Sequence, residues 1–347
     1  MSLTINTNLS SLIAQRSLNN ATNGMNTSLE RMSTGYKINH SKDNAAGYSI
    51  ANKWETQISS LDVAADNAAT GMDLLTTAEE TYSLLTSHLQ RVRDLTEQAA
   101  NGTYGSGSLK SLQAEVYARL QEITRISANS EFNGIKLMAY DIEDATNPLN
   151  AKSGLTDAGI NLQVGLYADE NSIINLNIEC FSNASVSGLF NSLKSTTSQT
   201  GIQLSQILSN AGMGTNAFNS KEGMEAFAAA CCGLVLDSYD EDTETGTFYL
   251  NTEEEYTAKE MLEFIDLAID DISKRATKIG AAQNRVESAM TALDVQSQNI
   301  TSSLSTLRDT DISSESSSYI QQQILQQASA TLLSTANQLP SIALNLI

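Results

Sequence analysis

The chain has 347 residues, of which 41% are apolar, 17% charged and 5% aromatic. This length suits two or three domains with a sizeable core. Its 20 basic and 40 acidic residues give a net charge of −20. That balance excludes nucleic acid or an anionic membrane as the main ligand, because both need a cationic surface. No apolar run reaches the roughly 20 residues that span a bilayer, so we expect no membrane insertion.

Both ends of the chain lack charge. Residues 1–15 and 316–347 carry no charged side chain, whereas residues 141–256 carry 17 acidic and 3 basic residues. Apolar residues recur at both ends in steps of three and four, as on one face of a helix. A helix that is exposed to solvent normally carries charged residues on its outer face, and these helices carry none, so we expect other copies of the chain to bury them. The side chains expected to pack there are Ile5, Leu9, Leu12, Leu325, Leu332, Leu339 and Leu346.

Two longer segments show the seven-residue apolar repeat of a coiled-coil seam. The first carries a series from Trp54 to Leu89 and a second series, offset by three residues, from Ala64 to Ala99. The second segment carries a series from Ile265 to Leu307. Its partner series is weaker and consists of Ile269, Ala276, Met290 and Leu304. A shorter amphipathic helix over 109–126 follows a glycine-rich turn and is expected to fold back on the first long helix.

The middle of the chain changes its period. Apolar residues alternate strictly over 160–166 and 174–180, which predicts a β-hairpin. Residues 182–254 mix serine- and glycine-rich loop with short helical stretches at 202–208 and 224–236 and a strand near 247–250. Their pattern predicts no particular fold.

These patterns predict a mainly α protein. We expect a long antiparallel coiled-coil or helical-bundle rod with both termini at one end, a β-hairpin and a small mixed α/β outer insert. The predicted domains are a terminal coiled coil of 1–45 with 310–347, a rod of 46–181 with 255–309 that includes the hairpin 160–180, and a variable outer domain of 182–254.

The sequence offers little for catalysis. His40 and His88 have no cysteine or second histidine nearby, which argues against a metal site or a Cys–His pair. The acidic run 237–246 departs from calcium-loop spacing, so we interpret it as a solvated loop. Cys180, Cys231 and Cys232 are interpreted as buried thiols. We therefore predict no catalytic residue, no metal and no cofactor.

Several segments together resemble bacterial flagellin, in the order in which that family carries them and over about two thirds of the chain. They lie near the two ends of the chain, within residues 1–140 and 257–347. The segments are Ile5–Asn8, Ser28–Asn39, Ser41–Ala51, Gln90–Leu95, Phe132–Gly134, Ile279–Arg285, Gln323–Ala328 and Ala336–Gln338.

This resemblance implies a secreted subunit that polymerises helically into the bacterial flagellar filament for motility. In the family, the terminal helices line the inner tube and the central domain faces outward. The resemblance also implies export by the flagellar type III apparatus, which fits a chain start without the basic and apolar stretches of a cleavable signal. The implied partners are other copies of the chain, the flagellar cap and hook-associated proteins, and an export chaperone bound by the tail 315–347.

The resemblance further implies roles for one surface stretch. Arg91, Leu95 and Glu115 match residues that the family presents to an animal Toll-like receptor. In the filament, the same surface packs against the next subunit. The predicted interface therefore comprises Gln90, Arg91, Val92, Arg93, Leu95 and Glu115.

Two other protein classes are weighed against a filament subunit. A hook–filament junction protein shares the export route and similar ends, but it would match less well over 41–51 and 90–95. An enzyme in the central insert, such as a metalloprotease, would need a His-Glu-x-x-His motif. No histidine follows His88, so we expect the chain not to be an enzyme.

Overall fold

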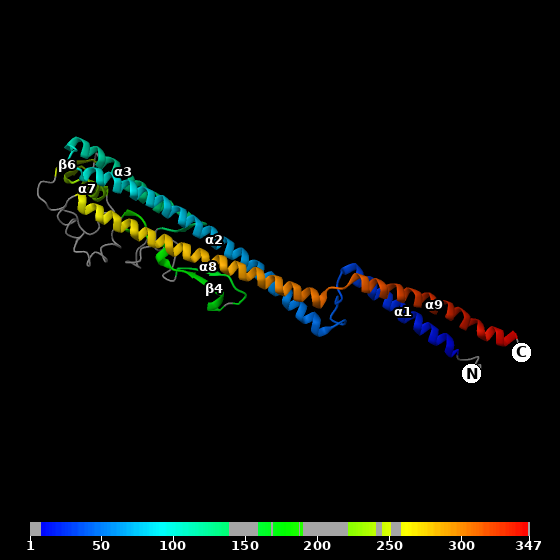
Figure 1. The fold of residues 1–347 in the computed structure, drawn as a ribbon. Coiled ribbons are helices and arrows are strands. Elements are labelled where there is room, and N and C mark those ends of the chain that lie inside the picture. The colour runs from blue at the N-terminus through cyan, green and yellow to red at the C-terminus, as the bar shows by residue number, and fades with distance from the viewer. Residues whose placement is uncertain are drawn as a thin grey trace. The chain divides into compact units, whose positions relative to one another are not determined.

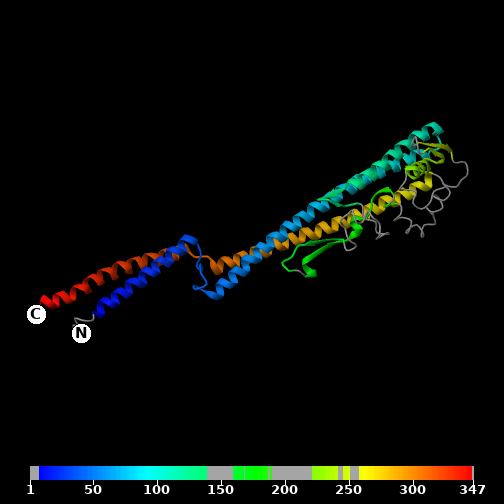
Figure 2. The same ribbon diagram turned by 180° about the vertical axis from the view of Figure 1, so that it is seen from behind.

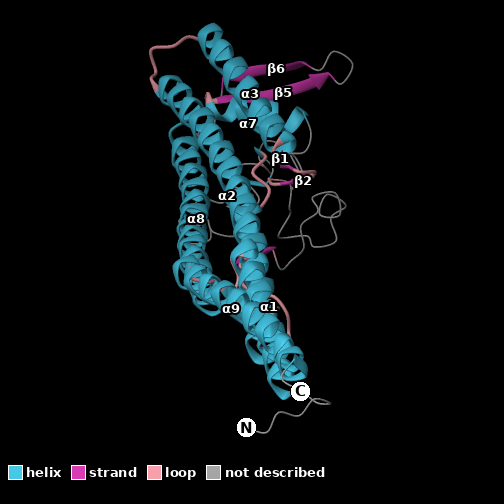
Figure 3. Ribbon diagram, turned by 90° about the vertical axis from the view of Figure 1, so that its right-hand side faces the viewer, coloured by secondary structure: helices cyan, strands magenta, loops and turns pink. Residues whose placement is uncertain are grey.

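The structure is a computed structural model that describes residues 8–138, 159–167, 169–186, 188–189, 221–240, 245–250 and 258–345. The described elements are α1 (Leu9–Thr34), α2 (Ala45–Ala100), α3 (Ser106–Asn129), β1 (Glu131–Phe132), β2 (Ile135–Lys136), β3 (Ile160–Gln163), the 3-10 turn η1 (Glu170–Ser172), β4 (Ile173–Leu176), the 3-10 turn η2 (Ile178–Phe181), α7 (Lys221–Cys231), β5 (Leu234–Asp240), β6 (Thr245–Leu250), α8 (Ala258–Arg308) and α9 (Ile312–Asn345) (Figure 1). The strands form separate two-stranded antiparallel hairpins, so the predicted mainly α fold is confirmed (Figure 3). Among the described helices, no stretch is both long and apolar enough to cross a membrane. The short helix predicted at 202–208 lies outside the described residues.

The chain divides into two compact units. Unit 1 comprises residues 1–62 and 294–347, and unit 2 comprises residues 63–293. The long helices α2 and α8 each contribute to both units.

Unit 1 is built on the antiparallel pair of α1 and α9, which run side by side in both views (Figures 1 and 2). The Asn8 carboxamide caps the start of α1 by accepting a hydrogen bond from the Ser11 amide. Gly35 ends α1 in the left-handed conformation, with φ of 76°. The Asn8 side chain also donates to the Ala336 carbonyl at 2.7 Å, which places the two ends of the pair together.

Unit 1 also contains the α1–α2 connection and the α8–α9 connection. The Lys37 amide donates to the Arg308 carbonyl at 2.6 Å, and the Thr310 amide donates to the Gly35 carbonyl at 2.9 Å. The Arg308 guanidinium lies 4.1 Å from the centre of the Tyr36 ring, a cation–π contact. The α1–α2 and α8–α9 connections are therefore tied to each other.

The core of unit 2 confirms the predicted seam of α2. The members of both series within this unit are buried, namely Ala64, Ala68, Leu75, Ala78, Tyr82, Leu85, Leu89, Val92 and Ala99. On α8 the predicted main series is also buried, from Ile265 through Leu293.

Within unit 2, the predicted partner series of α8 packs against the core but is only half-buried. Ile269, Ala276 and Met290 are half-buried, and the fully packed series lies one position earlier in the chain. It consists of Met261, Ala268, Arg275 and Ala282. Because this series contains the charged Arg275, apolar periodicity alone does not indicate it.

The β3–β4 hairpin is shorter than predicted. Ile160 pairs with Leu176 and Leu162 with Ile174, but the second strand stops at Leu176. Residues 178–181 form η2 instead, where the Tyr82 hydroxyl donates to the Cys180 carbonyl at 2.9 Å. The Cys180 carbonyl thus accepts its hydrogen bond from Tyr82 of α2, whereas in a longer β-ladder it would accept one from the neighbouring strand.

The β3–β4 hairpin packs against α2 at Gly71. A Cβ atom at this position would stand 2.4 Å from the Leu162 Cδ1 atom, which real contacts do not allow. Gly71→Val is therefore expected to displace the hairpin and to destabilise unit 2 by about 1–3 kcal/mol. Urea unfolding measures the loss, and the same substitution at Gly280, whose Cβ would meet nothing within 4 Å, is the control. Equal losses of stability at both positions would contradict this packing of the hairpin on Gly71.

Within residues 182–254, the predicted helix over 224–236 is wrong at its end. The helix α7 stops at Cys231, Gly233 takes a left-handed φ of 68°, and β5 begins at Leu234. The predicted strand near 247–250 lies in β6.

Figure 3 shows α7, β5 and β6 beside α3. Phe227 of α7 stacks edge-to-face on Phe264 of α8 at 6.1 Å, so α7 belongs to the core of unit 2.

Candidate subunit interface

The seam between α1 and α9 is made of small side chains. Its buried members are Ala14, Ala21, Ser28, Ser329 and Ala336. Gly24 permits the close approach, because a Cβ atom at this position would lie only 2.9 Å from the Gln322 side chain. Small residues let the two helices approach closely, but they bury little apolar area.

Several large apolar side chains of the pair face outward. Leu9 is 66% exposed, Leu12 55%, Leu325 45% and Leu332 61%. Four more side chains on these helices are about half exposed, namely Ile13, Leu29, Ile320 and Ile324. Of the other predicted packing residues, Ile5 and Leu346 lie outside the described residues, and Leu339 lies in α9 without a described side chain.

Few charges accompany this apolar surface. Arg31 pairs with Glu315 at 3.8 Å across the helices, and Glu30 meets His40 at 2.8 Å. Both pairs lie at the end of the pair away from the termini. The rest of the exposed α9 surface with described side chains consists of Gln, Ser, Thr, Ala and Asn together with the exposed Leu and Ile side chains. Such a surface is typical of a helix that another protein covers.

A second candidate surface lies on α2 and α3 in unit 2. The Arg91 guanidinium donates to the Glu115 carboxylate from Nε at 2.9 Å and from Nη2 at 2.8 Å. Arg119 approaches the same carboxylate at 3.8 Å. The three side chains are 35–43% exposed, and Gln90 beside them is exposed. Arg91 and Arg119 thus approach one carboxylate, and the charge of Arg119 also acts on Glu122.

The rest of the predicted stretch points elsewhere. Val92 is 0% exposed and Leu95 1% exposed, and both pack in the core of unit 2. Arg93 turns toward α8, where its Nε donates to Asp266 at 2.6 Å, and this bond raises the pKa of the guanidinium. The structure therefore brings Arg91 and Glu115 together on the surface and places Val92 and Leu95 inside.

Arg275 is a residue that the sequence patterns missed. Its side chain is 7% exposed and pairs with Asp271 at 2.7 Å. Its Nη1 atom donates to the Ser182 and Asn183 carbonyls, both at 3.2 Å. Beside it, burial raises the pKa of Tyr82 to about 12, against the opposite influence of the Arg275 charge.

No group of side chains with metal-binding geometry occurs among the described residues. The acidic run 237–246 falls on β5, β6 and the connection between them, of which residues 241–244 lie outside the description. The predicted burial of Cys180, Cys231 and Cys232 is confirmed. Desolvation raises the pKa of Cys231 well above its ordinary value and that of Cys232 to about 12, which disfavours the nucleophilic thiolate form of both side chains.

Comparison with known proteins gives matches at both ends and over the whole length. The bacterial flagellin N-terminal helical region matches residues 5–141, and the bacterial flagellin C-terminal helical region matches residues 262–347. Polar flagellin F of Vibrio parahaemolyticus is 32% identical and flagellin D of Vibrio anguillarum is 30% identical. Flagellin E of Vibrio cholerae is 29% identical. Each alignment covers 100% of this chain and of the relative.

Proposed function

Because the chain belongs to the bacterial flagellin family, and so is a structural subunit of the extracellular flagellar filament that serves motility, we propose that neighbouring copies bury its terminal helices. In this proposal, residues 1–45 and 310–347 form the inner tube, 46–181 and 255–309 form a surrounding shell, and 182–254 face outward. The family is structural, and we propose that the chain carries no catalytic activity. A junction protein of the hook is not favoured, since both matching regions and the relatives named above are flagellins.

The observation that carries this proposal is the composition of the α1–α9 pair. Small residues fill its internal seam, while Leu9, Leu12, Leu325 and Leu332 remain 45–66% exposed. Burying one leucine stabilises a protein by about 1.5–3 kcal/mol. Neighbouring copies that cover these side chains would therefore stabilise the assembled state much more than the isolated chain.

Subunits related by a rotation and a rise make heterologous contacts, which do not close and so extend a filament. The exposed patch of Arg91, Glu115, Arg119 and Gln90 is a suitable second contact. The same patch is our proposed contact for an animal Toll-like receptor. The buried Leu95 would reach either partner only after local rearrangement.

Three further partners follow from the family rather than from any observed contact. We propose that the tail 315–347 binds an export chaperone before secretion, and that the filament ends meet cap and hook-associated proteins. A chaperone would cover the same apolar side chains of α9 that neighbouring subunits cover later, which would prevent assembly before export.

Substitution of Leu325 and Leu332 by Gln tests the role of the exposed apolar face. Leu325 is 45% and Leu332 61% exposed, so covering both buries about as much as one whole leucine. Their loss is therefore expected to weaken each subunit contact by about 1.5–3 kcal/mol and to raise the critical concentration for seeded polymerisation at least about 10-fold. Sedimentation of filaments grown on wild-type seeds measures this concentration.

Val63→Gln is the matched control, because Val63 is 57% exposed on α2 and lies outside the α1–α9 pair. It should assemble like the wild type. A wild-type critical concentration for the double Leu variant would show that neighbours do not bury this face.

A further inference from the structure

Long heptad seams do not by themselves fix the register of two helices. In unit 2, α2 and α8 are antiparallel, since Glu79 meets Gln283 while Arg93 meets Asp266. The buried α8 series repeats Ile265, Ile272 and Ile279 at seven-residue steps. A slip of seven residues, about 10.5 Å along the axis, would again place apolar side chains opposite apolar side chains.

Arg275 breaks this periodicity. It occupies the buried series otherwise formed by Met261, Ala268 and Ala282, and its side chain is 7% exposed. The guanidinium meets Asp271 at 2.7 Å on its own helix and the Ser182 and Asn183 carbonyls at 3.2 Å. Asp271 would move with it in any slip of α8, but the two carbonyls would not.

The carbonyls belong to a segment that α2 holds. Immediately before them, the Cys180 carbonyl accepts the bond from the buried Tyr82 hydroxyl of α2 at 2.9 Å. Immediately after them, the Ala184 amide donates to the Met138 carbonyl, which also accepts from Ser127 of α3. Arg275 therefore connects α8 to a segment that is fixed to the α2–α3 hairpin.

We propose that Arg275 sets the register of α8 against α2. In the native register the buried charge has Asp271 and two carbonyls as partners. After a slip of seven residues it would lie in the core without the carbonyls, which is strongly unfavourable for a buried cation. The Arg93–Asp266 and Glu79–Gln283 contacts are exposed and select the register less strongly.

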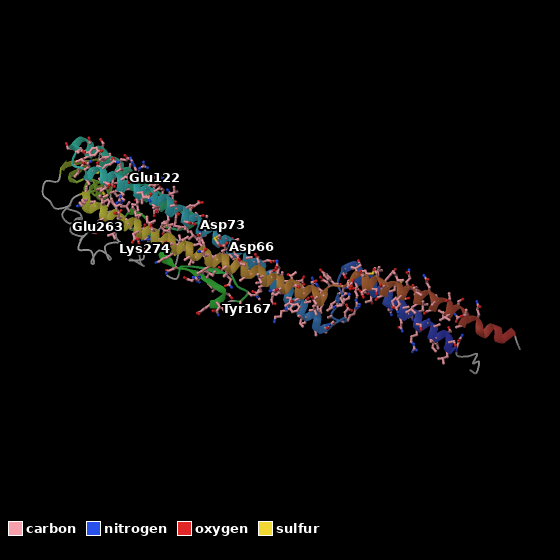
Figure 4. The ribbon with its side chains drawn as sticks, in the orientation of Figure 1. Asp66, Asp73, Glu122, Tyr167, Glu263 and Lys274 are labelled. Atoms are coloured by element: carbon pink, nitrogen blue, oxygen red, sulfur yellow. The ribbon has the colours of Figure 1, made fainter. Side chains whose placement is uncertain are left out.

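The distance between spin labels on the two helices tests this role. Asp73 on α2 and Glu263 on α8 are exposed and well separated along the axis (Figure 4). Both are replaced by Cys and labelled in the monomeric chain, and intact mass confirms two labels, since the native thiols are buried. The chain with Arg275 is expected to give one distance. Arg275→Met is expected to give a second population displaced by about 10 Å, with helicity retained.

Arg285→Met is the matched control, because Arg285 is an exposed arginine on the same helix, and it should leave one distance. Arg275→Lys keeps a buried cation and should also leave one distance. If Arg275→Met fails to fold, Arg275→Gln replaces it, and the same second population of label distances is expected. A single unchanged distance in the folded Met or Gln variant would overturn the proposal. Because the measurement uses monomer, its outcome is independent of filament assembly.

Discussion

A chain that ends at Glu315 is expected to remain monomeric on wild-type seeds at concentrations at which the full chain elongates them. The deletion removes nearly all of α9, including Ile320, Ile324, Leu325 and Leu332 on its exposed face. It also leaves the close-packed face of α1 without its partner. These four side chains are 45–61% exposed, so their burial by neighbouring copies is worth on the order of 3–7 kcal/mol per subunit. Electron microscopy and sedimentation measure assembly.

The control for this truncation is the stability of unit 2, to which the deleted residues do not belong. Its urea unfolding midpoint should be unchanged, so failure to polymerise would not reflect a misfolded chain. Filaments formed by the truncated chain would contradict the assignment of α9 to the subunit interface.

Phe227→Ala is expected to destabilise unit 2 by about 3–5 kcal/mol, as for other large-to-small changes in a core. Phe227 is 3% exposed and contacts Phe264, which is 1% exposed. For the same reason, replacing residues 185–250 with a short linker is expected to unfold unit 2, although the sequence predicts that these residues belong to a variable outer domain. Urea unfolding followed by circular dichroism measures both variants.

Tyr167→Ala is the matched aromatic control, since Tyr167 is 62% exposed beside β3. It should change the free energy of unfolding by less than about 0.5 kcal/mol. If Phe227→Ala behaved like Tyr167→Ala, α7 would not be part of the core.

Periodicity predicted the long helices well because each buries one continuous apolar face. The α2 seam from Ala64 to Ala99 and the α8 series from Ile265 to Leu293 are both buried as expected. The hairpin at 160–176 was predicted by the alternation of Ile160 and Leu162 with Ile174 and Leu176. In each case the pattern that buries apolar side chains also determines the local structure.

The same patterns failed where burial depends on partners far away in the chain. Arg275 is buried through carbonyls of Ser182 and Asn183, which no local repeat indicates. The internal α1–α9 seam is lined by small residues, which the spacing of large apolar residues does not indicate, whereas the residues expected to pack against other copies lie on the exposed face. For the surface near Arg91, the resemblance suggested a continuous stretch, but a helix turns Val92 and Leu95 inward.

Amide hydrogen exchange of α1 and α9, measured in the monomer and in the filament, tests most directly whether neighbouring copies bury these helices. The small-residue seam stabilises the isolated pair weakly, so exchange over 9–34 and 312–338 should be fast in the monomer and at least about 100-fold slower in the filament. Equally slow exchange over these residues in the monomer would contradict the account, because the two helices would then be stable without neighbouring subunits.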